Sequence, residues 1–579
     1  MAARTSSTAR VAPAESATDA AAASWAGWFA NSRWTPWLII ALGAFLRILL
    51  LGIKPPHFDE GINGWFVDQM TKTGFYRYDP TNYHGPFHFY VLFLSLTLFG
   101  RNLWALRMPV VLASIFCVRL TFAFEPLLGR KITRWAALAM AVSPGYVFYG
   151  RYSIHEVWLL LFSMLFILGL LGLWRFGNTK YLWCAGMGLF GMILTKETYI
   201  MHLGCALLAW PVAWVTHLIR PAEGTTRARQ TWSYLDLAAV LLVGVAAVIF
   251  FYSGTFLNFA GLKGLYQTFS AWFETGNKGN GHEKPWYYWL MLIGRYEAAA
   301  AIGLLLSVAC LWFRNINLRY LAIYGVGTLA AYSIVAYKTP WCIISIVWPL
   351  LFVFGVVAAL PPLKMPWKSY VALGAIALLL GISWAVLYKY ATGWGRFWPA
   401  VLTSLTAVAI VTALLLAFVL LVRYAMATRV ALVVALAASL VYSVALNYFR
   451  CTTETEPYVY VQTYNDVFKL TDPLLRLAHR NPTYYQLVGH IIRSSAYPLP
   501  WMLGDFTKVG YYEKETLPSP LDADFLLVEE DKIASVESKL HGSYYTMPLR
   551  IRPYQDTSKV YLSARVFKDM FPGRVPEFA

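Results

Sequence analysis

Residues 35–61 read TPWLIIALGAFLRILLLGIKPPHFDEG and place a pair of acidic side chains directly after a long apolar run. The apolar run, 36–53, is near the ~20 residues that a helix needs to cross a bilayer. Asp59 and Glu60 therefore stand at the rim of a span, where ionised groups are costly and adjacent like charges resist joint ionisation. This segment predicts a membrane protein with a functional site at the edge of its first span.

The whole chain has the composition of a protein that crosses the membrane many times. Of its 579 residues, 58% are hydrophobic and 13% are charged, whereas soluble domains carry about a quarter charged residues. Residues 1–450 hold 34 Lys and Arg against 14 Asp and Glu, and residues 451–579 hold 14 against 16. The basic excess is dispersed between apolar spans, which is typical of cytoplasmic loops and argues against a nucleic-acid partner.

The apolar segments predict about 13 membrane-spanning helices. They lie near 36–53, 86–104, 108–126, 135–150, 157–174, 181–195, 199–218, 236–252, 288–312, 320–336, 341–360, 370–388, 398–421 and 430–447. Basic connectors at 130–134, 175–180, 220–229, 314–319, 364–368 and 423–429 indicate the cytoplasmic side. Counting from them, the loops alternate consistently only if 86–126 crosses once, with one piece re-entrant or lateral.

The topology places the N-terminus in the cytoplasm and the C-terminus outside, in a cytoplasmic (inner) membrane. We expect a disordered cytoplasmic tail at 1–33, a transmembrane domain at 34–447 and an extracytoplasmic α/β domain at 448–579. The transmembrane domain has a first outer loop at 54–88, with an amphipathic surface helix over 59–72, and a second outer loop at 253–289. Alternating patterns predict strands at 523–528 and 559–562 in the last domain, and helices are expected at 464–479 and 530–540.

Three polar clusters fall on the predicted outer side. They are Asp59-Glu60, the stretch Arg151-Tyr-Ser-Ile-His155-Glu156 and the pair Lys196-Glu197. The second and third clusters are each also explained by a buried ion pair that holds helix ends together. Three such clusters on one face favour a shared polar cavity.

Two further motifs place a lysine close to Pro-Trp at the outer end of a span. They are Glu283-Lys284-Pro285-Trp286 and Lys338-Thr339-Pro340-Trp341. A lysine can hold a phosphate, and a tryptophan can stack on a sugar or anchor the chain at the lipid headgroups. We interpret Lys284, Lys338 and Trp341 as candidate donor-binding residues, with an interfacial anchor as the alternative.

Metal and disulfide chemistry have little support in the sequence. No CxxC spacing exists among the six cysteines. His57, His84 and His88 flank the first outer loop, but their spacing fits no standard metal-binding pattern. We therefore assign no cofactor and no metal ligand, and a divalent metal stays an open alternative.

These residues suit the transfer of a group from a membrane-held donor. A carboxylate would take the proton of an acceptor hydroxyl or amine, which then attacks an anomeric carbon whose leaving group is a lipid phosphate. Lys or Arg side chains would stabilise the departing phosphate. The outer clusters contain both kinds of residue.

In the order of its motifs the chain resembles the GT-C membrane glycosyltransferases, which include protein O-mannosyltransferases, aminoarabinose transferases and their family-39-like relatives. The matching elements are Asp59-Glu60, His84-Gly85-Pro86, Arg107 with Pro109, Ser143-Pro144 with Arg151, and Lys196-Glu197. The motifs around Lys284 and Lys338, and Tyr497-Pro498-Leu499-Pro500-Trp501, are similar to the subfamily described as flippase-activity-associated proteins. Met502-Leu503-Gly504 departs from that last motif, where an aromatic and a basic residue are expected.

The resemblance implies a GT-C fold of about 11–14 spans, polyprenyl-phosphate sugar donors and Asp59 as the general base, with Glu60 in support. Under this hypothesis Arg151, Lys196, Lys284, Lys338 and Trp341 bind the donor. The residues that orient donor or acceptor are His84, His155, Glu156 and Glu197. The acceptor would be a glycan, a lipid or a protein. Two other functions stay open: a flippase for lipid-linked sugars, or its accessory protein, and a scaffold whose outer domain binds envelope polysaccharide.

Overall fold

The computed structural model describes residues 29–82, 84–277, 282–359, 425–513, 517–553 and 555–578, and short pieces between 367 and 382. Helices dominate the first part of the chain. They are α3 (Thr35–Ile48), α4 (Phe58–Thr73), α5 (Phe87–Phe99), α6 (Leu103–Thr121), α7 (Glu125–Leu128), α8 (Arg130–Val142), α9 (Pro144–Tyr149), α10 (Glu156–Phe176), α11 (Thr179–Ile193), α12 (Tyr199–Ile219), α13 (Tyr234–Tyr252), α14 (Ala260–Asn277), α15 (Tyr288–Tyr296), α16 (Ala298–Ser307), α17 (Ile316–Ile334), α18 (Ile343–Gly355) and α21 (Ala425–Val444).

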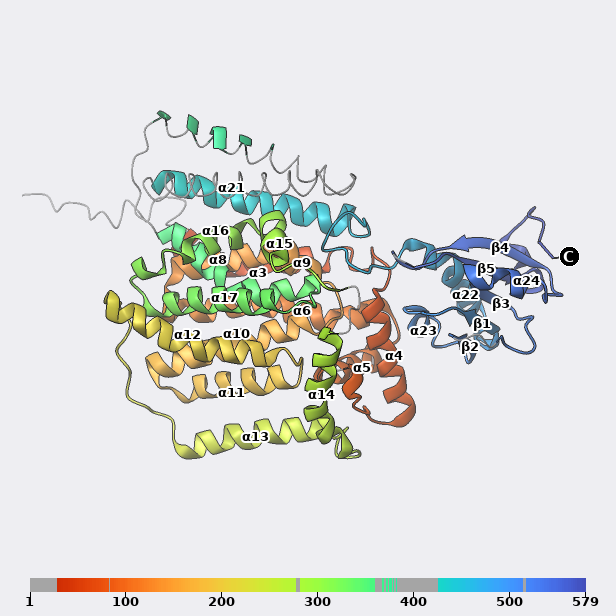
Figure 1. Ribbon diagram of the computed structural model, residues 1–579, viewed down its shortest axis with the longest axis horizontal. Coiled ribbons are helices and arrows are strands. Elements are labelled where there is room, and N and C mark those ends of the chain that lie inside the picture. Colours follow the sequence, from red (N-terminus) through yellow and green to blue (C-terminus); the bar gives the residue numbers. More distant parts are fainter. Residues whose placement is uncertain are drawn as a thin grey trace, which may run out of the picture.

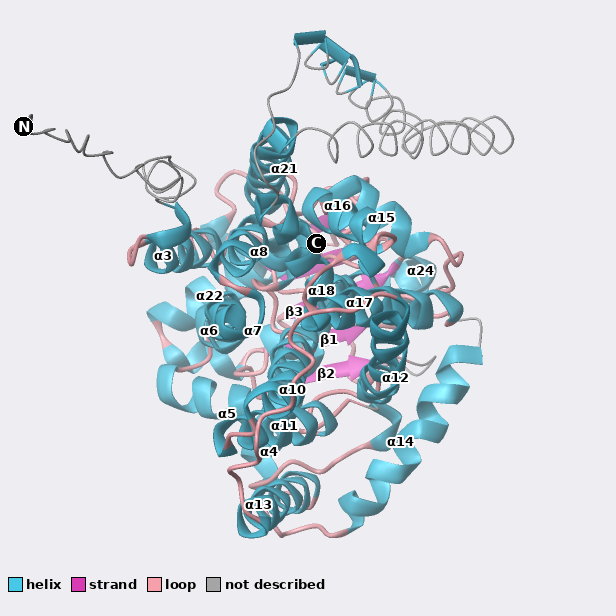
Figure 2. Ribbon diagram, turned by 90° about the vertical axis from the view of Figure 1, so that its left-hand side faces the viewer, coloured by secondary structure: helices cyan, strands magenta, loops and turns pink. Residues whose placement is uncertain are grey.

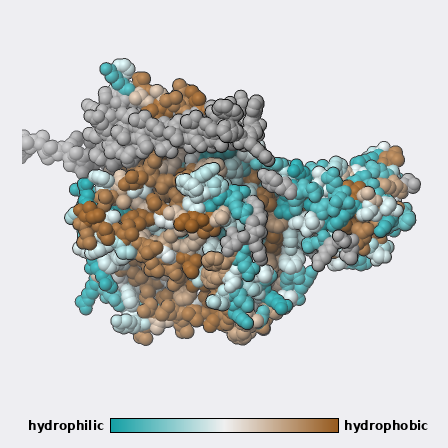
Figure 3. All heavy atoms as spheres, viewed as in Figure 1, coloured by the Kyte–Doolittle hydropathy of each residue, from teal (hydrophilic) through white to brown (hydrophobic). Residues whose placement is uncertain are grey.

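The long helices run side by side in a bundle, and the C-terminal domain stands at one end of it (Figure 1). A view along the bundle shows the helices end-on with the strands behind them (Figure 2). Apolar side chains cover much of the bundle surface, whereas the C-terminal domain is mostly hydrophilic (Figure 3). In the described ranges, six helical segments are long and apolar enough to cross a membrane. We call the bundle end that carries the C-terminal domain the domain-proximal end, and the other the distal end.

Loops that the sequence assigns to opposite sides of the membrane lie at opposite ends of the bundle. At the distal end the Asn315 side chain donates to Leu127 O at 2.7 Å, and the Glu223 amide donates to Arg314 O at 2.6 Å. At the domain-proximal end the backbone amide of Gly85 donates to Thr195 O at 3.0 Å, and that of Lys338 donates to His282 O at 3.1 Å. The predicted division of the loops is therefore present in the fold.

Three expected spans have a different form in the structure. The 135–150 segment breaks at Ser143-Pro144 into α8 and α9, because proline cannot donate its backbone nitrogen to a continuing helix. The 288–312 segment breaks at Glu297 into α15 and α16. Helix α5 has 13 residues and reaches only ~20 Å, short of the ~30 Å apolar core; this agrees with a single crossing of 86–126. Most of the span expected at 370–388, the whole of that at 398–421, and most of the tail at 1–33 lie outside the described residues.

The C-terminal domain is a small α/β unit. Its strands are β1 (Val488–Ile492), β2 (Lys508–Tyr512), β3 (Phe525–Glu529), β4 (Tyr544–Leu549) and β5 (Ser558–Ser563), in the order β2-β1-β3-β5-β4. Strand β1 pairs in parallel with β2 and β3, and β5 pairs antiparallel with β3 and β4. Its helices are α22 (Phe468–Arg480), α23 (Leu499–Met502), α24 (Ile533–Glu537) and α25 (Ala564–Phe567). The strands predicted at 523–528 and 559–562 correspond to β3 and β5, and the helices predicted at 464–479 and 530–540 to α22 and α24.

Helix α4 begins with a capping box that uses the predicted carboxylate pair. The His57 side chain accepts the backbone amide of Asp59, and Glu60, three residues into the helix, accepts the amide of His57. Gly74 ends the helix in the left-handed conformation, with φ of 81°. The helix lies at the domain-proximal end, between the bundle and α23 (Figure 1).

Candidate functional site

Glu60 is fully engaged by its neighbours. Its side chain is 0% exposed, and its oxygens accept hydrogen bonds from the backbone amides of His57 at 2.8 Å and Ser153 at 2.9 Å. The Arg107 guanidinium donates to it twice, from Nε at 2.8 Å and Nη2 at 2.7 Å. Burial alone would raise the pKa of Glu60, but Arg107 and the two amides hold this pKa below its usual value. Glu60 therefore acts as an anchor.

Asp59 is free by comparison. Its side chain is 32% exposed, and no described residue donates a hydrogen bond to its carboxylate. The closest ring nitrogen is Nδ1 of His57, at 3.8 Å from Oδ2. That nitrogen already accepts the backbone amide of Asp59 at 3.1 Å, while Nε2 of His57 donates to Tyr460 O at 2.8 Å.

His57 is therefore held as the neutral Nε2–H tautomer. The two hydrogen bonds assign the proton to Nε2 and leave Nδ1 as an acceptor. Burial lowers the pKa of His57, which disfavours its charged form. Although His57 lies beside Asp59, it does not neutralise that carboxylate.

The second and third polar clusters meet at one cavity. Nζ of Lys196 contacts Oε1 of Glu156, and Nδ1 of His84 lies 3.1 Å from Oε2 of Glu197. Lys196, Glu197 and His84 line a cavity of about 510 Å³, open mouth included, with Lys338 and Trp341 on another wall. Nζ of Lys338 donates to the carbonyls of Lys284, at 3.1 Å, and Val335, and burial lowers the pKa of Lys338. We call this the cationic cavity.

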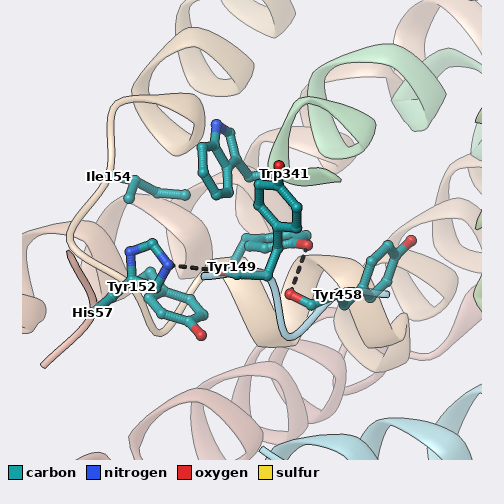
Figure 4. A pocket seen from close by; sticks show the side chains of 7 residues that line it. His57, Tyr149, Tyr152, Ile154, Trp341 and Tyr458 are labelled. Atoms are coloured by element: carbon teal, nitrogen blue, oxygen red, sulfur yellow. Dashed lines mark hydrogen bonds between the residues drawn. The ribbon is translucent and has the colours of Figure 1, made fainter. Parts of the chain in front are cut away.

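A second cavity, which we call the aromatic cavity, adjoins the first. It is lined by His57, Tyr149, Tyr152, Ile154, Trp341, Tyr458 and Tyr460, and its space of about 190 Å³, open mouth included, leaves no room for a water molecule. Figure 4 shows the rings converging, with the Tyr149 hydroxyl donating to Tyr458 O at 3.1 Å. Trp341 lines both cavities, and His57 connects the aromatic cavity to Asp59. The Asp59 carboxylate, the aromatic cavity and the cationic cavity thus lie in one region of the protein.

Comparisons with known proteins concern the sequence and the fold of this chain. The sequence profile of the family described as "Dolichyl-phosphate-mannose-protein mannosyltransferase" matches residues 83–251. The crystal structure of ArnT from Cupriavidus metallidurans bound to undecaprenyl phosphate matches with a TM-score of 0.60 and 16% identity, over 93% of this chain and 98% of that chain. The chain thus has the fold of ArnT, and its residues 83–251 resemble this mannosyltransferase family. The apo structure of the same ArnT gives a TM-score of 0.58 and 17% identity, over 92% and 98% of the two chains. No curated protein sequence matches.

Most of the predicted site residues gather at the domain-proximal end. Several of them line neither cavity: Asp59 and Glu60 lie at the start of α4, Glu156 is buried against Lys196, and His155 and Lys284 lie beside the cavities. His155 is 3% exposed, with its ring 4.7 Å from that of His84 and 4.5 Å from that of His88. Nζ of Lys284 lies 5.6 Å from the centroid of the Tyr460 ring.

Arg151 has a different place from the one its motif predicted. Its guanidinium is 0% exposed and donates to the last carbonyls of α3 and to the residues that follow. The acceptors are Leu46 O at 3.1 Å, Arg47 O at 3.2 Å, Leu49 O at 2.6 Å and Leu50 O at 2.7 Å. A cation at a helix C-terminus satisfies carbonyls that have no partner within the helix. The structure thus assigns Arg151 to the capping of α3 and does not bring it to the cationic cavity, which corrects the expected donor contact.

The motif search missed residues that only the fold brings to the site. Tyr458 and Tyr460 come from the segment that leads into the C-terminal domain, where their spacing carried no signal. Glu297 is 2% exposed and accepts from Ser143 Oγ at 2.5 Å, the Gly145 amide at 2.8 Å and the Tyr458 hydroxyl at 3.0 Å. Glu297 was detectable as a rare acid inside an apolar segment.

No group of three or more His, Cys, Asp or Glu in the described ranges is placed to hold a metal.

Proposed function

We propose that this chain is an inverting glycosyltransferase that moves a sugar from a polyprenyl-phosphate donor to an extracytoplasmic acceptor, with Asp59 as the general base. The acceptor is a glycan, a lipid or a protein. The observation that carries the proposal is the difference between the two neighbouring carboxylates. Glu60 accepts four hydrogen bonds and is 0% exposed, whereas Asp59 is 32% exposed and accepts none from a described residue.

A general base needs a free lone pair that an acceptor can reach. Asp59 would take the proton from an acceptor hydroxyl or amine while that atom forms a bond to the anomeric carbon of the donor. The bond between this carbon and the phosphate oxygen breaks at the same time, and its electron pair leaves with the phosphate. Because the attack comes from the face opposite the leaving group, the configuration at the anomeric carbon inverts.

The leaving phosphate would be held by the lysines of the cationic cavity. Lys196 and Lys338 line it, and Lys284 lies next to it through its carbonyl, which accepts from Nζ of Lys338. Cations around a departing phosphate stabilise the negative charge that develops there. Undecaprenyl phosphate bound to ArnT is a ligand of this chemical class in a protein of the same fold. Trp341 would form the wall against which the sugar stacks, and His84, His155, Glu156 and Glu197 would orient the substrates.

We place this site on the extracytoplasmic side of a cytoplasmic (inner) membrane. The described basic connectors, at 130–134, 175–180, 220–229 and 314–319, lie at the distal end, which the positive-inside rule assigns to the cytoplasm. The N-terminus would be cytoplasmic and the C-terminal domain extracytoplasmic. The apolar side chains that cover much of the bundle surface would suit the polyprenyl tail of the donor (Figure 3).

The test is transfer by the full-length protein in proteoliposomes. These contain a panel of undecaprenyl-phosphate [¹⁴C]sugars and an envelope extract as acceptor. We expect Asp59→Asn to lower transfer by at least ~100-fold, the usual range for loss of a general base. Exposed Asp531→Asn is the matched control and should retain the wild-type rate. Wild-type transfer by Asp59→Asn would overturn the assignment.

The same proteoliposomes test the flippase alternative. A flippase would carry the labelled lipid from one leaflet to the other without forming a labelled acceptor product. Lipid crossing that is lost in the Lys196→Met variant, with no transfer by the wild-type protein, would support that function in place of the transferase.

A further inference from the structure

The segment that leads from the bundle into the C-terminal domain runs past both halves of the proposed site, and Tyr460 contacts each of them. The backbone carbonyl of Tyr460 accepts a hydrogen bond from Nε2 of His57 at 2.8 Å. Nδ1 of the same histidine accepts the backbone amide of Asp59 at 3.1 Å. A single side chain therefore connects Tyr460 to the first turn of α4, which carries the proposed base.

The hydroxyl of Tyr460 is connected to the other half of the site. It shares a hydrogen bond of 2.6 Å with Nδ1 of His282, in the second outer loop. The Lys338 amide donates to His282 O at 3.1 Å, where the two stretches pair antiparallel. Two residues further along, the Lys284 amide donates to Ala336 O at 3.1 Å. The two paired stretches thus carry Lys284 and Lys338, both proposed phosphate-binding residues.

The ring of Tyr460 packs between side chains of both halves. Nζ of Lys284 lies 5.6 Å from its centroid, and the centroid of the Trp341 ring lies 6.0 Å from it. The Trp341 and His57 rings, which both line the aromatic cavity, are in edge contact with centroids 5.9 Å apart (Figure 4). Because the aromatic cavity has no room for a water molecule, a displacement of Tyr460 is passed directly to its neighbours.

The backbone directly after Tyr460 is strained. Val461 has φ of 53°, in the left-handed region, where a β-branched residue is a genuine outlier. Such strain persists only where the surrounding structure over-determines the conformation, and it gathers at functional sites. The φ angle of Val461 orients the peptide plane that contains the Tyr460 carbonyl. The strained conformation therefore accompanies the contact of this carbonyl with His57.

We propose that Tyr460 is a positioning residue, which aligns the half of the site that holds the base with the half that holds the donor phosphate. Its carbonyl acts through His57, and its hydroxyl acts through His282. This inference rests on the proposed function, because it takes Asp59 as the base and the lysines as phosphate ligands. It makes the segment between the two domains a part of the framework of the active site.

The test is the kinetics of transfer by full-length Tyr460→Phe in the proteoliposome assay with undecaprenyl-phosphate [¹⁴C]sugars. The substitution removes the hydroxyl and keeps the ring and the carbonyl. A misplacement of about 1 Å between reacting groups can cost ~100-fold in rate, so we expect kcat per undecaprenyl-phosphate-binding site to fall by at least ~10-fold. The KM for the donor should stay within about twofold of the wild-type value, because no phosphate ligand is removed.

Tyr464→Phe is the matched control. It removes a hydroxyl from the same segment, where the hydrogen bond to Glu454 is exposed, and should keep the wild-type kcat.

The variant His282→Phe removes the other partner of the Tyr460 hydroxyl. If Tyr460 acts through His282, the double variant Tyr460→Phe/His282→Phe should be no slower than the slower single variant. Independent losses would multiply instead.

Two substitutions at Val461 test the carbonyl of Tyr460. Glycine adopts a positive φ without strain, so Val461→Gly keeps the carbonyl in place. Proline fixes φ near −65°, so in Val461→Pro the carbonyl turns away from His57. The kcat of Val461→Pro should be at least ~10-fold below that of Val461→Gly.

The midpoint of thermal unfolding and the protection of the C-terminal domain from protease show whether each variant is folded. A wild-type kcat in folded Tyr460→Phe, or losses that multiply in the double variant, would overturn the role of Tyr460. If Tyr460→Phe does not fold, His282→Phe breaks the same hydrogen bond from its other side, and a wild-type kcat there has the same meaning. A full rate in Asp59→Asn would instead overturn the proposed function, so the two failures are distinguishable.

Discussion

Arg107 and Glu60 form a bidentate ion pair in which neither side chain is exposed, with Nε 2.8 Å from Oε1 and Nη2 2.7 Å from Oε2. The same guanidinium donates from Nη1 to the carbonyls of Leu51 and Lys54, at 2.7 and 3.2 Å. One side chain of α6 thus holds both the loop before α4 and the first turn of α4. The ion pair fixes the start of α4, and thereby the position of Asp59, without a contact to the Asp59 carboxylate.

Removal of one partner of this pair should destabilise the protein strongly. Glu60→Gln leaves a buried guanidinium without its counter-charge, and such losses cost about 3–5 kcal/mol. The measurement is the free energy of unfolding in detergent micelles. Glu223→Gln breaks an exposed pair with Arg314 and should cost no more than ~1 kcal/mol. Equal effects of the two substitutions would contradict the anchoring role.

Stability should fall on mild acidification because of His57. Its pKa in the folded protein is lowered by burial, so below the usual value of about 6.5 the unfolded chain binds this proton more readily. The contribution of neutral His57 is therefore complete above about pH 6.5 and is lost as the pH falls toward its folded pKa. Glu60, whose folded pKa is also lowered, contributes above about pH 4.3 and loses that contribution at lower pH.

The variant His57→Asn separates these two effects. Asparagine can cap the N-terminus of α4 but does not titrate. We expect the melting temperature of this variant to change less than that of the wild type between pH 7 and 5.5. His541→Asn replaces an exposed histidine and should keep the wild-type slope. A wild-type slope in His57→Asn would assign the effect to other groups.

The packing of α4 against the C-terminal domain should be sensitive to a single methyl group. In Gly64→Ala the new Cβ would lie 2.2 Å from Cδ1 of Trp501, so the two elements must separate. We expect faster proteolysis between the bundle and the C-terminal domain, together with lower transfer. Gly294→Ala, which has no neighbour within 4 Å, is the control. Combination of Gly64→Ala with Trp501→Ala should restore protease resistance; continued sensitivity would argue against this contact.

Lys196 has a structural role in its ion pair with Glu156 and a proposed role in donor binding, and substitutions should separate the two. Lys196→Met leaves Glu156 buried without its cation, which costs about 3–5 kcal/mol in such pairs. The double variant Lys196→Met/Glu156→Leu removes both charges and should regain most of that stability. Transfer should stay low in both variants, and the melting-temperature shift caused by undecaprenyl phosphate should be lost. Full transfer by the double variant would exclude Lys196 from the donor site.

The sequence predicted the parts of the molecule that have a simple local cause. The apolar segments predicted most described helices of the bundle, and the described basic connectors lie at one of its ends, while their cytoplasmic side stays a prediction. The amphipathic pattern over 59–72 predicted the helix that corresponds to α4. The strands β3 and β5 followed from alternation of apolar and polar residues.

The remaining features depend on long-range contacts that no local pattern contains. Arg151 belongs to a polar motif, yet it caps α3, about a hundred positions earlier. Tyr458 and Tyr460 reach the site from the segment that follows the bundle, where Tyr458 contacts Glu297 and the Tyr460 carbonyl accepts from His57. The sequence also does not reveal that the Glu60 carboxylate is buried and hydrogen-bonded while that of Asp59 is partly exposed. This difference arises from the contacts of Glu60 with Arg107 and Ser153.

The contact between His57 Nε2 and Tyr460 O joins residues 403 positions apart. Since a ribosome makes the chain from its N-terminus, α4 is synthesised long before the segments that hold its outer face. A chain that ends before Tyr460 would lack this contact beside Asp59. Under the proposed function, we expect such a chain to have no transfer activity.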